Sequence, residues 1–240
     1  MSIYVTGDTH GDMGRFSDIC FGTENNLREH DKLIVCGDFG FVWHNSKDHT
    51  SKTADDSQLD ALSNKPYEIL FIDGNHENFN ELYFYPEVEK YGAPTHKIRD
   101  NIYHLERGRI YNIEGKTFFT FGGAYSVDKA YRTQDISWWP QELPNDDEEY
   151  KRAIESLKTV GNKVDYVITH TCPGEIVKLM LHKITSPEEY ELNGFFDWIM
   201  HETEFKQWYF GHWHTDESKS FNLNGKNKAF TALFYDVKQV

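Results

Sequence analysis

Five short apolar runs in this sequence each end in a group of Gly, Asp, Asn or His residues. The runs cover residues 2–6, 32–36, 67–72, 163–169 and 207–210. Their apolar residues are nearly continuous rather than alternating, which is typical of β-strands covered on both faces. In open α/β sheets the loops that follow such strands converge at one edge, where ligands bind. The pattern therefore predicts an α/β fold with polar side chains gathered at the strand ends.

Helical patterns lie between these runs, and further strand patterns follow in the middle and at the end of the chain. The proline of Ser186-Pro187 is typical of a first helical position, and Asn224-Gly225 indicates a turn within a strand-rich tail, 219–240. Neither an internal repeat nor a flexible linker divides the chain, so we expect one domain over residues 1–240. The predicted helices cover residues 14–24, 55–64, 146–160 and 193–202, and the middle strands cover 101–105, 109–113 and 116–121.

The charge balance narrows the class of partner. The chain carries 25 Lys plus Arg against 39 Asp plus Glu, a net charge of −14. This charge opposes binding to long nucleic acids or anionic lipid, and no apolar run reaches the ~18–20 residues of a membrane span. Three widely spaced cysteines without a CxxC motif are typical of a reducing compartment. We therefore expect a cytoplasmic protein that acts on a small anionic molecule and does not associate with a membrane.

The strand ends carry seven side chains that are good metal ligands. Mixed carboxylate and imidazole donors suit Mn²⁺, Fe, Zn²⁺ or Co²⁺ rather than Ca²⁺, which takes oxygen ligands alone. Seven donors are too many for one ion that keeps a position open for water. They suit two ions that share a bridging carboxylate, about 3.5–4 Å apart, an arrangement that serves phosphoryl transfer. The seven are Asp8, His10, Asp38, Asn75, His170, His212 and His214.

The order of these motifs resembles one family, the calcineurin-like metallophosphoesterases. The resemblance runs from residue 8 to residue 214, and its most specific string is Gly-Asn-His-Glu at 74–77. It implies a four-layer α-β-β-α sandwich of two mixed sheets flanked by helices, with a dinuclear metal site at one end. The motifs are Asp8-Thr9-His10, Gly37-Asp38, Gly74-Asn75-His76-Glu77, His170 and Gly211-His212-Trp213-His214.

The resemblance also implies a role for each matching residue. One ion would be held by Asp8, His10, Asp38 and His214, and the second by Asp38, Asn75, His170 and His212, so that Asp38 bridges them. His76 would contact the scissile phosphate and protonate or stabilise the leaving oxygen. Glu77 is expected to hold its loop. Independently, side chains two residues apart in extended backbone share a face, so His212 and His214 would both reach the ions.

The sequence departs from the protein Ser/Thr phosphatases of this family after the bridging aspartate. Those enzymes place an Asp that orients the catalytic histidine, and an Arg that binds phosphate, where this chain has Phe41 and Val42. Phosphate must therefore be bound from elsewhere. Arg132, in a Gly-rich and aromatic segment, is the candidate for phosphate binding, and His44 and Tyr125 are candidates for lining the substrate cleft.

The function that the resemblance implies is hydrolysis of a phosphate monoester. A metal-bridged hydroxide would attack phosphorus in line, and His76 would assist the leaving group; two divalent ions are required, with Mn²⁺ the expected metal. One alternative is a phosphodiesterase or nuclease acting on a nucleotide or a short nucleic-acid end with the same two ions. A second is a binding module that holds metal without catalysis. The natural substrate and the oligomeric state are left open by the sequence.

Overall fold

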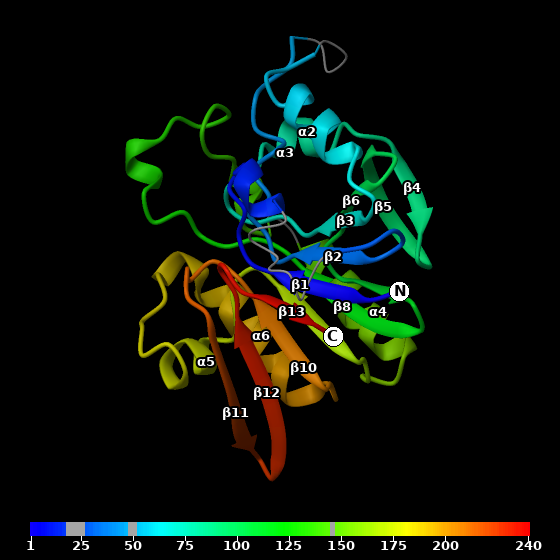
Figure 1. Ribbon diagram of the computed structural model, residues 1–240. Coiled ribbons are helices and arrows are strands. Elements are labelled where there is room, and N and C mark those ends of the chain that lie inside the picture. Colours follow the sequence, from blue (N-terminus) through cyan, green and yellow to red (C-terminus); the bar gives the residue numbers. More distant parts are fainter. Residues whose placement is uncertain (18–26, 48–51, 145–146) are drawn as a thin grey trace.

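The computed structural model describes residues 1–17, 27–47, 52–144 and 147–240, and its strands form two mixed sheets (Figure 1). The first sheet has the strand order β13-β1-β2-β3-β6-β5-β4. Its four central strands β1, β2, β3 and β6 are parallel, and the others pair antiparallel with their neighbours. The bounds are β1 Ile3–Thr6, β2 Lys32–Val35, β3 Glu68–Phe71, β4 Glu87–Lys90, β5 Ala93–Arg99, β6 Ile102–Leu105 and β13 Val237–Gln239.

The second sheet has the order β11-β12-β10-β9-β8-β7, again with a parallel centre and antiparallel edges. The predicted turn at Asn224-Gly225 joins β11 to β12, and both residues have positive φ, 53° and 81°, which Asn and Gly tolerate best. The bounds are β7 Arg109–Ile113, β8 Lys116–Phe121, β9 Tyr166–Thr169, β10 Gln207–Phe210, β11 Glu217–Leu223 and β12 Lys226–Ala232.

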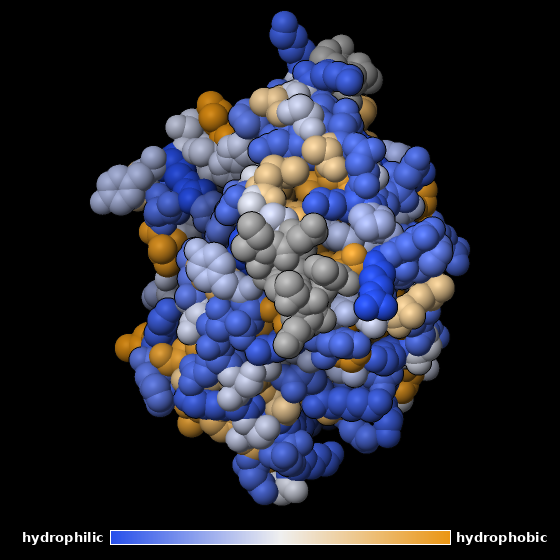
Figure 2. Space-filling view, in the orientation of Figure 1, coloured by the Kyte–Doolittle hydropathy of each residue, from blue (hydrophilic) through white to orange (hydrophobic). Residues whose placement is uncertain are grey.

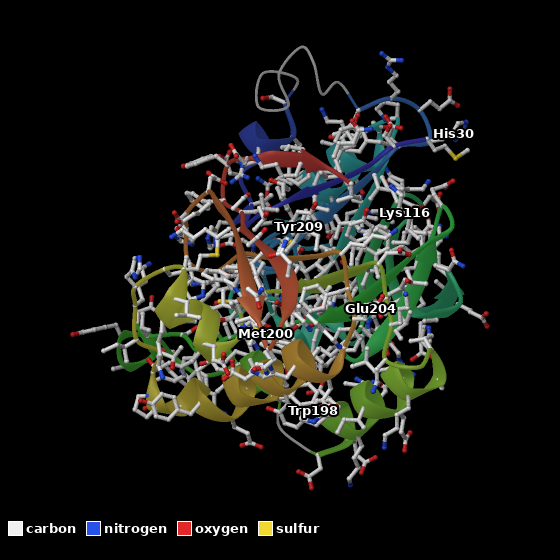
Figure 3. All side chains as sticks on the ribbon, turned by 90° about the horizontal axis from the view of Figure 1, so that it is seen from below. His30, Lys116, Trp198, Met200, Glu204 and Tyr209 are labelled. Carbon is white, nitrogen blue, oxygen red and sulfur yellow. The ribbon has the colours of Figure 1, made fainter. Side chains whose placement is uncertain are left out.

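Three apolar clusters define four layers, as the resemblance implies. One cluster lies between the sheets and joins residues such as Val5 and Ile34 of the first sheet to Ile168 and Tyr209 of the second. The other two pack helices on the outer faces. In Figure 3, Met200 and Trp198 lie on α6, and Tyr209 lies further into the molecule. The first sheet is covered by α2 (Asp56–Ser63) and α3 (Phe79–Leu82); the second is covered by α4 (Asp147–Thr159), α5 (Gly174–Leu179) and α6 (Tyr190–Glu202).

The structure differs from the sequence prediction mainly at helix ends and in one hairpin. Of the helix predicted at 14–24, the described part is a short 3₁₀ turn, η1 (Met13–Phe16), and residues 18–24 lie outside the described residues. The predicted helix at 146–160 is α4, although residue 146 is also outside them. Helix α6 begins before residue 193, because the predicted proline start forms η4 (Pro187–Glu189), which leads directly into it. The hairpin β4–β5 and the short helices α3 and α5 were not predicted.

The surface agrees with the charge balance of the sequence. Figure 2 shows hydrophilic residues over most of the face in view. Among the described residues, no helix is long and apolar enough to cross a membrane. Cys36 and Cys172 are buried free thiols, and burial raises the pKa of both. Cys20 lies outside the described residues.

Candidate metal centre

The seven predicted donors meet at one end of the molecule, where parallel strands of both sheets finish. Strand β1 leads into Asp8 and His10, β2 into Asp38, and β3 into Asn75. From the second sheet, β9 leads into His170 and β10 into His212 and His214. Because the two sheets pack face to face, their carboxyl ends lie beside each other, and the five loops that follow these strands meet in one cluster. The predicted placement at the strand ends is therefore what the fold shows.

Short distances connect these donors into a continuous cluster. Nε2 of His10 lies 3.0 Å from Nε2 of His214, which is 3.1 Å from Oδ2 of Asp8. These three residues form a group whose donor atoms all lie within 4.8 Å of one another. On the other side, Oδ1 of Asn75 lies 3.0 Å from both Nε2 of His170 and Nδ1 of His212.

Asp38 lies between the two halves of the cluster. Its Oδ1 is 3.3 Å from Nε2 of His170, and its Oδ2 is 3.8 Å from Nδ1 of His10. The carboxylate therefore has one oxygen directed to each half. It is 1% exposed, so water does not screen its charge. This is the position that a bridging ligand requires.

The spacing and chemistry of the donors fit divalent cations. Two ligand atoms about 2.1 Å from one ion and at right angles are about 3.0 Å apart, which is the separation seen between His10 and His214 and around Asn75. Carboxylate oxygens, imidazole nitrogens and one amide oxygen are the donor set of Mn²⁺, Fe or Zn²⁺ sites. The residues present therefore fit the metal ions that the family resemblance implies.

Glycines in the motifs make room for the donors. A Cβ atom at Gly37 would lie under 3.0 Å from the His170 ring, and one at Gly74 would lie equally close to the carboxylate of Asp38. At Gly211 it would clash with the carboxylate of Asp8. Each of these glycines thus stands where a side chain from another strand end must pass. The sequence motifs contain these glycines, but this packing role is visible only in the folded chain.

Four of the seven donors have left-handed backbone. The φ angles are 47° at His10, 48° at Asp38, 64° at His212 and 49° at His214, a region that costs non-glycine residues about 1 kcal/mol or more and clusters at functional sites. The expectation that His212 and His214 share a face of extended backbone is therefore wrong. The segment makes a tight turn, with the Trp213 amide donating to Gly211 O at 2.7 Å, and the turn brings both rings to the cluster.

Burial and close ion pairs set the protonation of the cluster. Burial raises the pKa of the Asp38 carboxyl, but His170 outweighs this effect and holds the pKa well below its ordinary range. Burial lowers the pKa of His170, yet Asp38 raises it to about 10. Burial also lowers the pKa of His212 to about 3, and His170 adds to that shift. Since a ligating imidazole must be neutral, a cation would take the place of the His170 proton.

Groups behind the donors hold them in place. The amide of His212 donates to both carboxylate oxygens of Asp8 at 3.0 Å, and Nδ1 of His170 lies 2.8 Å from Cys36 O. Glu77 is fully buried and accepts from the amides of Phe39 at 2.7 Å and Gly40 at 3.3 Å. It therefore ties the Gly-Asn-His-Glu loop to the loop of Asp38, as expected for a residue that holds its loop.

His76 is placed beside the cluster and against Arg132. Its amide donates to Oδ1 of Asp38 at 2.8 Å, and its ring nitrogens lie 2.9 and 3.2 Å from the two terminal nitrogens of the Arg132 guanidinium. Burial lowers the pKa of His76 and the Arg132 charge lowers it further, against the opposing effect of Asp38. Burial and the Arg132 charge therefore favour the neutral form of the imidazole.

Arg132, the candidate for phosphate binding, lies beside His76. Phe41 and Val42 are buried in the apolar cluster of the first sheet, so the absence of Asp and Arg there is a packing feature. The guanidinium is anchored by Oδ2 of Asp128 at 2.7 Å and Ser137 O at 3.0 Å. It reaches His76 from the segment after β8, which Figure 1 shows in green, extending away from the sheets.

A cleft of about 470 Å³ opens over the cluster. Its floor includes Asp38 and Asn75, and its walls include Tyr125, Lys183 and Trp213. Tyr125, a predicted cleft residue, thus lines this cleft. Lys183 was missed, because it follows a helix rather than a strand and no motif marks it. His44 lines a neighbouring hollow instead of this cleft.

The two mixed sheets thus carry carboxylate and imidazole donors at their joined ends, an arrangement suited to holding metal ions. The model of the calcineurin-like phosphoesterase family matches residues 1–216. The chain belongs to the calcineurin-like phosphoesterase family.

Two solved structures are similar to this chain at low sequence identity. One is a Staphylococcus aureus protein assigned as a 5′-nucleotidase, with 14% identity and a TM-score of 0.54 over 100% of this chain and 50% of that one. This chain therefore spans half the length of that protein. Another is the phosphopantetheinyl hydrolase of Mycobacterium tuberculosis, with 15% identity and a TM-score of 0.46 over 100% of this chain and 95% of that one. No curated protein sequence matches this chain.

Proposed function

We propose that this protein hydrolyses a small phosphate monoester with two divalent cations, of which Mn²⁺ is the favoured one. The observation that carries the proposal is the cluster of seven donors, in which one buried carboxylate, Asp38, lies between two groups of three. When bound, the two ions would activate water and neutralise the phosphoryl oxygens. The Staphylococcus aureus protein of similar fold is named as a 5′-nucleotidase, which is consistent with a small phosphorylated substrate.

The ligand roles follow from the two halves of the cluster. Asp8, His10 and His214 would hold one ion, and Asn75, His170 and His212 the other, with Asp38 shared between them. The neutral amide of Asn75 limits the negative charge of the second half, which a phosphate ester must approach. The net charge of −14 opposes a long polyanion but not a small anion drawn to bound cations.

His76 and Arg132 would act on the leaving group as a pair. With a lowered pKa, His76 would act as a neutral imidazole whose N–H donates a hydrogen bond to the leaving oxygen and stabilises it, while the proton that this oxygen finally takes up would come from water. The Arg132 cation against the ring disfavours the imidazolium, which supports this role of His76 as a neutral donor. A guanidinium at this point is also suited to a phosphoryl oxygen.

One assay separates the candidate functions. The purified protein is incubated with Mn²⁺ and either p-nitrophenyl phosphate or its bis-ester. We expect turnover of the monoester at a much higher kcat/KM than the bis-ester. Preferential turnover of the bis-ester would instead support a phosphodiesterase or nuclease. Binding of Mn²⁺ without turnover of either ester would support the non-catalytic binding module.

Replacing Arg132 tests its pairing with His76. We expect Arg132→Ala to lower kcat/KM for the monoester by about 10–100-fold, because it removes a charged donor that contacts the catalytic ring. Arg132→Lys keeps the charge but not the planar fork, so we expect only partial recovery. Steady-state kinetics of both variants check this. Unchanged turnover and KM in Arg132→Ala would show that the guanidinium has no part in the reaction.

We also propose that residues 1–240 act as one domain in the cytoplasm. The support for one domain is that β13, near the end of the chain, pairs with β1 at its start. The buried free thiols support a reducing compartment.

A further inference from the structure

A second hollow adjoins the metal cleft at His76. Its volume is about 270 Å³, and it is lined by His10 and His76 of the site together with Trp43, His44, Asp55 and Gln58. We call it the Trp43 pocket. Since His76 lines both hollows, a molecule whose phosphate lies over the donor cluster can extend past this ring into the Trp43 pocket.

The pocket contains a histidine held in one orientation by a buried carboxylate. Oδ1 of Asp55 lies 2.6 Å from Nδ1 of His44, and its Oδ2 accepts from the amides of Trp43 at 2.8 Å and His44 at 2.7 Å. The Asp55 side chain is 7% exposed and that of His44 is 57% exposed. Because Nδ1 is engaged, Nε2 is the atom available to a ligand, and it has no hydrogen-bond partner among the described residues.

The other lining groups add a flat surface and an amide. The Trp43 indole is fixed by a stacked contact with His76, with ring centroids 6.3 Å apart, and by an edge contact with the buried Trp139 at 5.4 Å. Gln58 projects from α2, and its side-chain amide has no partner within the described part of the chain. An indole face with an imidazole nitrogen and a free amide suits a planar ring that carries polar atoms on its edge.

We propose that the Trp43 pocket binds the leaving alcohol of the substrate, and that this alcohol carries a heteroaromatic ring of the nucleoside type. The inference rests on the proposed phosphoesterase function, because in-line displacement sends the leaving oxygen away from the attacking water and towards His76. The ring packs against Trp43, and its edge atoms bond to Nε2 of His44 and the Gln58 amide. A volume below the usual ~300–1,000 Å³ of ligand sites limits the occupant to about one ring system.

The test compares two monoesters that differ in the leaving alcohol. With Mn²⁺ present, kcat/KM is measured for adenosine 5′-monophosphate and for glycerol 2-phosphate, which has no ring. We expect the wild-type protein to prefer the nucleotide, and we expect His44→Ala and Gln58→Ala each to lower the preference ratio about tenfold, mainly through KM for the nucleotide. Gln58→Ala leaves the Asp55 contacts intact, so it decides the question if His44→Ala does not fold.

The matched control is Ser57→Ala, an exposed neighbour on α2 outside the pocket, which should leave the ratio unchanged. Hydrolysis of both esters without preference, or a ratio that neither pocket variant changes, would overturn the proposal that the Trp43 pocket binds the leaving alcohol. Either result would leave the proposed phosphoesterase function in place. Hydrolysis of neither ester by the Mn²⁺-loaded protein would overturn the proposed function, and the assignment of the leaving group with it.

Discussion

Asp38→Asn should abolish phosphoesterase activity, with a loss of about 1,000-fold or more in kcat. Asp38 has one oxygen directed to each half of the cluster, Oδ1 at 3.3 Å from His170 and Oδ2 at 3.8 Å from His10. An amide of nearly the same shape removes the negative charge and one of the two acceptor oxygens. We therefore expect the bound divalent metal, measured by elemental analysis, to fall together with activity.

A neighbouring aspartate provides the matched control for this variant. Asp12 lies in the first site loop, is exposed, and caps η1 by accepting from the Gly14 amide at 2.8 Å. Asparagine caps equally well, so Asp12→Asn should keep both metal and activity. Full activity in Asp38→Asn would mean that the bridging position is misassigned.

Arg107→Met should cause the largest loss of stability, about 3–5 kcal/mol of unfolding free energy. The Arg107 guanidinium donates to Oδ2 of Asp73 through Nε at 2.8 Å and Nη2 at 2.6 Å, and His104 lies 3.1 Å from Oδ1. Asp73 and His104 are at most 1% exposed and Arg107 is 2% exposed. Removing the guanidinium leaves a carboxylate buried beside one histidine, without its main counter-charge.

Thermal and urea unfolding measure this effect. For a chain of this length we expect a fall in Tm of roughly 10 °C, and reduced activity as well, because Asp73 directly precedes the Gly-Asn-His-Glu loop. Lys163→Met is the control, since Lys163 pairs with Glu204 at the surface, where both side chains are more than 60% exposed and the pair contributes at most about 1 kcal/mol. Equal stability of the two variants would show that the buried network does not stabilise the fold.

Much of the site could be predicted from the sequence because strand ends are visible in it. A continuous apolar run followed by Gly-Asp or Gly-His marks the point where a buried strand reaches the sheet edge, and parallel strands gather such points together. The seven donors were named this way, and the structure brings all of them into one cluster. The four-layer arrangement came from the family resemblance, since periodicity alone does not separate one sheet from two.

Contacts between distant segments could not be predicted in the same way. The link between Arg132 and His76 joins residues 56 positions apart, and no local pattern encodes it. In the sequence, Asp55 is only the first residue of a predicted helix. Its contact with the His44 ring is visible only in the folded chain. The hairpin β4–β5 was missed because polar residues such as Glu87 and Glu89 fill an edge strand that is covered on one side only.

Counting the metal ions while following activity tests the central claim most directly. Protein saturated with Mn²⁺ and freed of excess ion is assayed for metal content and for p-nitrophenyl phosphate hydrolysis, before and after treatment with a chelator. We expect two ions per chain, loss of hydrolysis as they are removed, and recovery when Mn²⁺ is restored. Undiminished hydrolysis by protein that the same measurement shows to be free of metal would contradict the two-cation site.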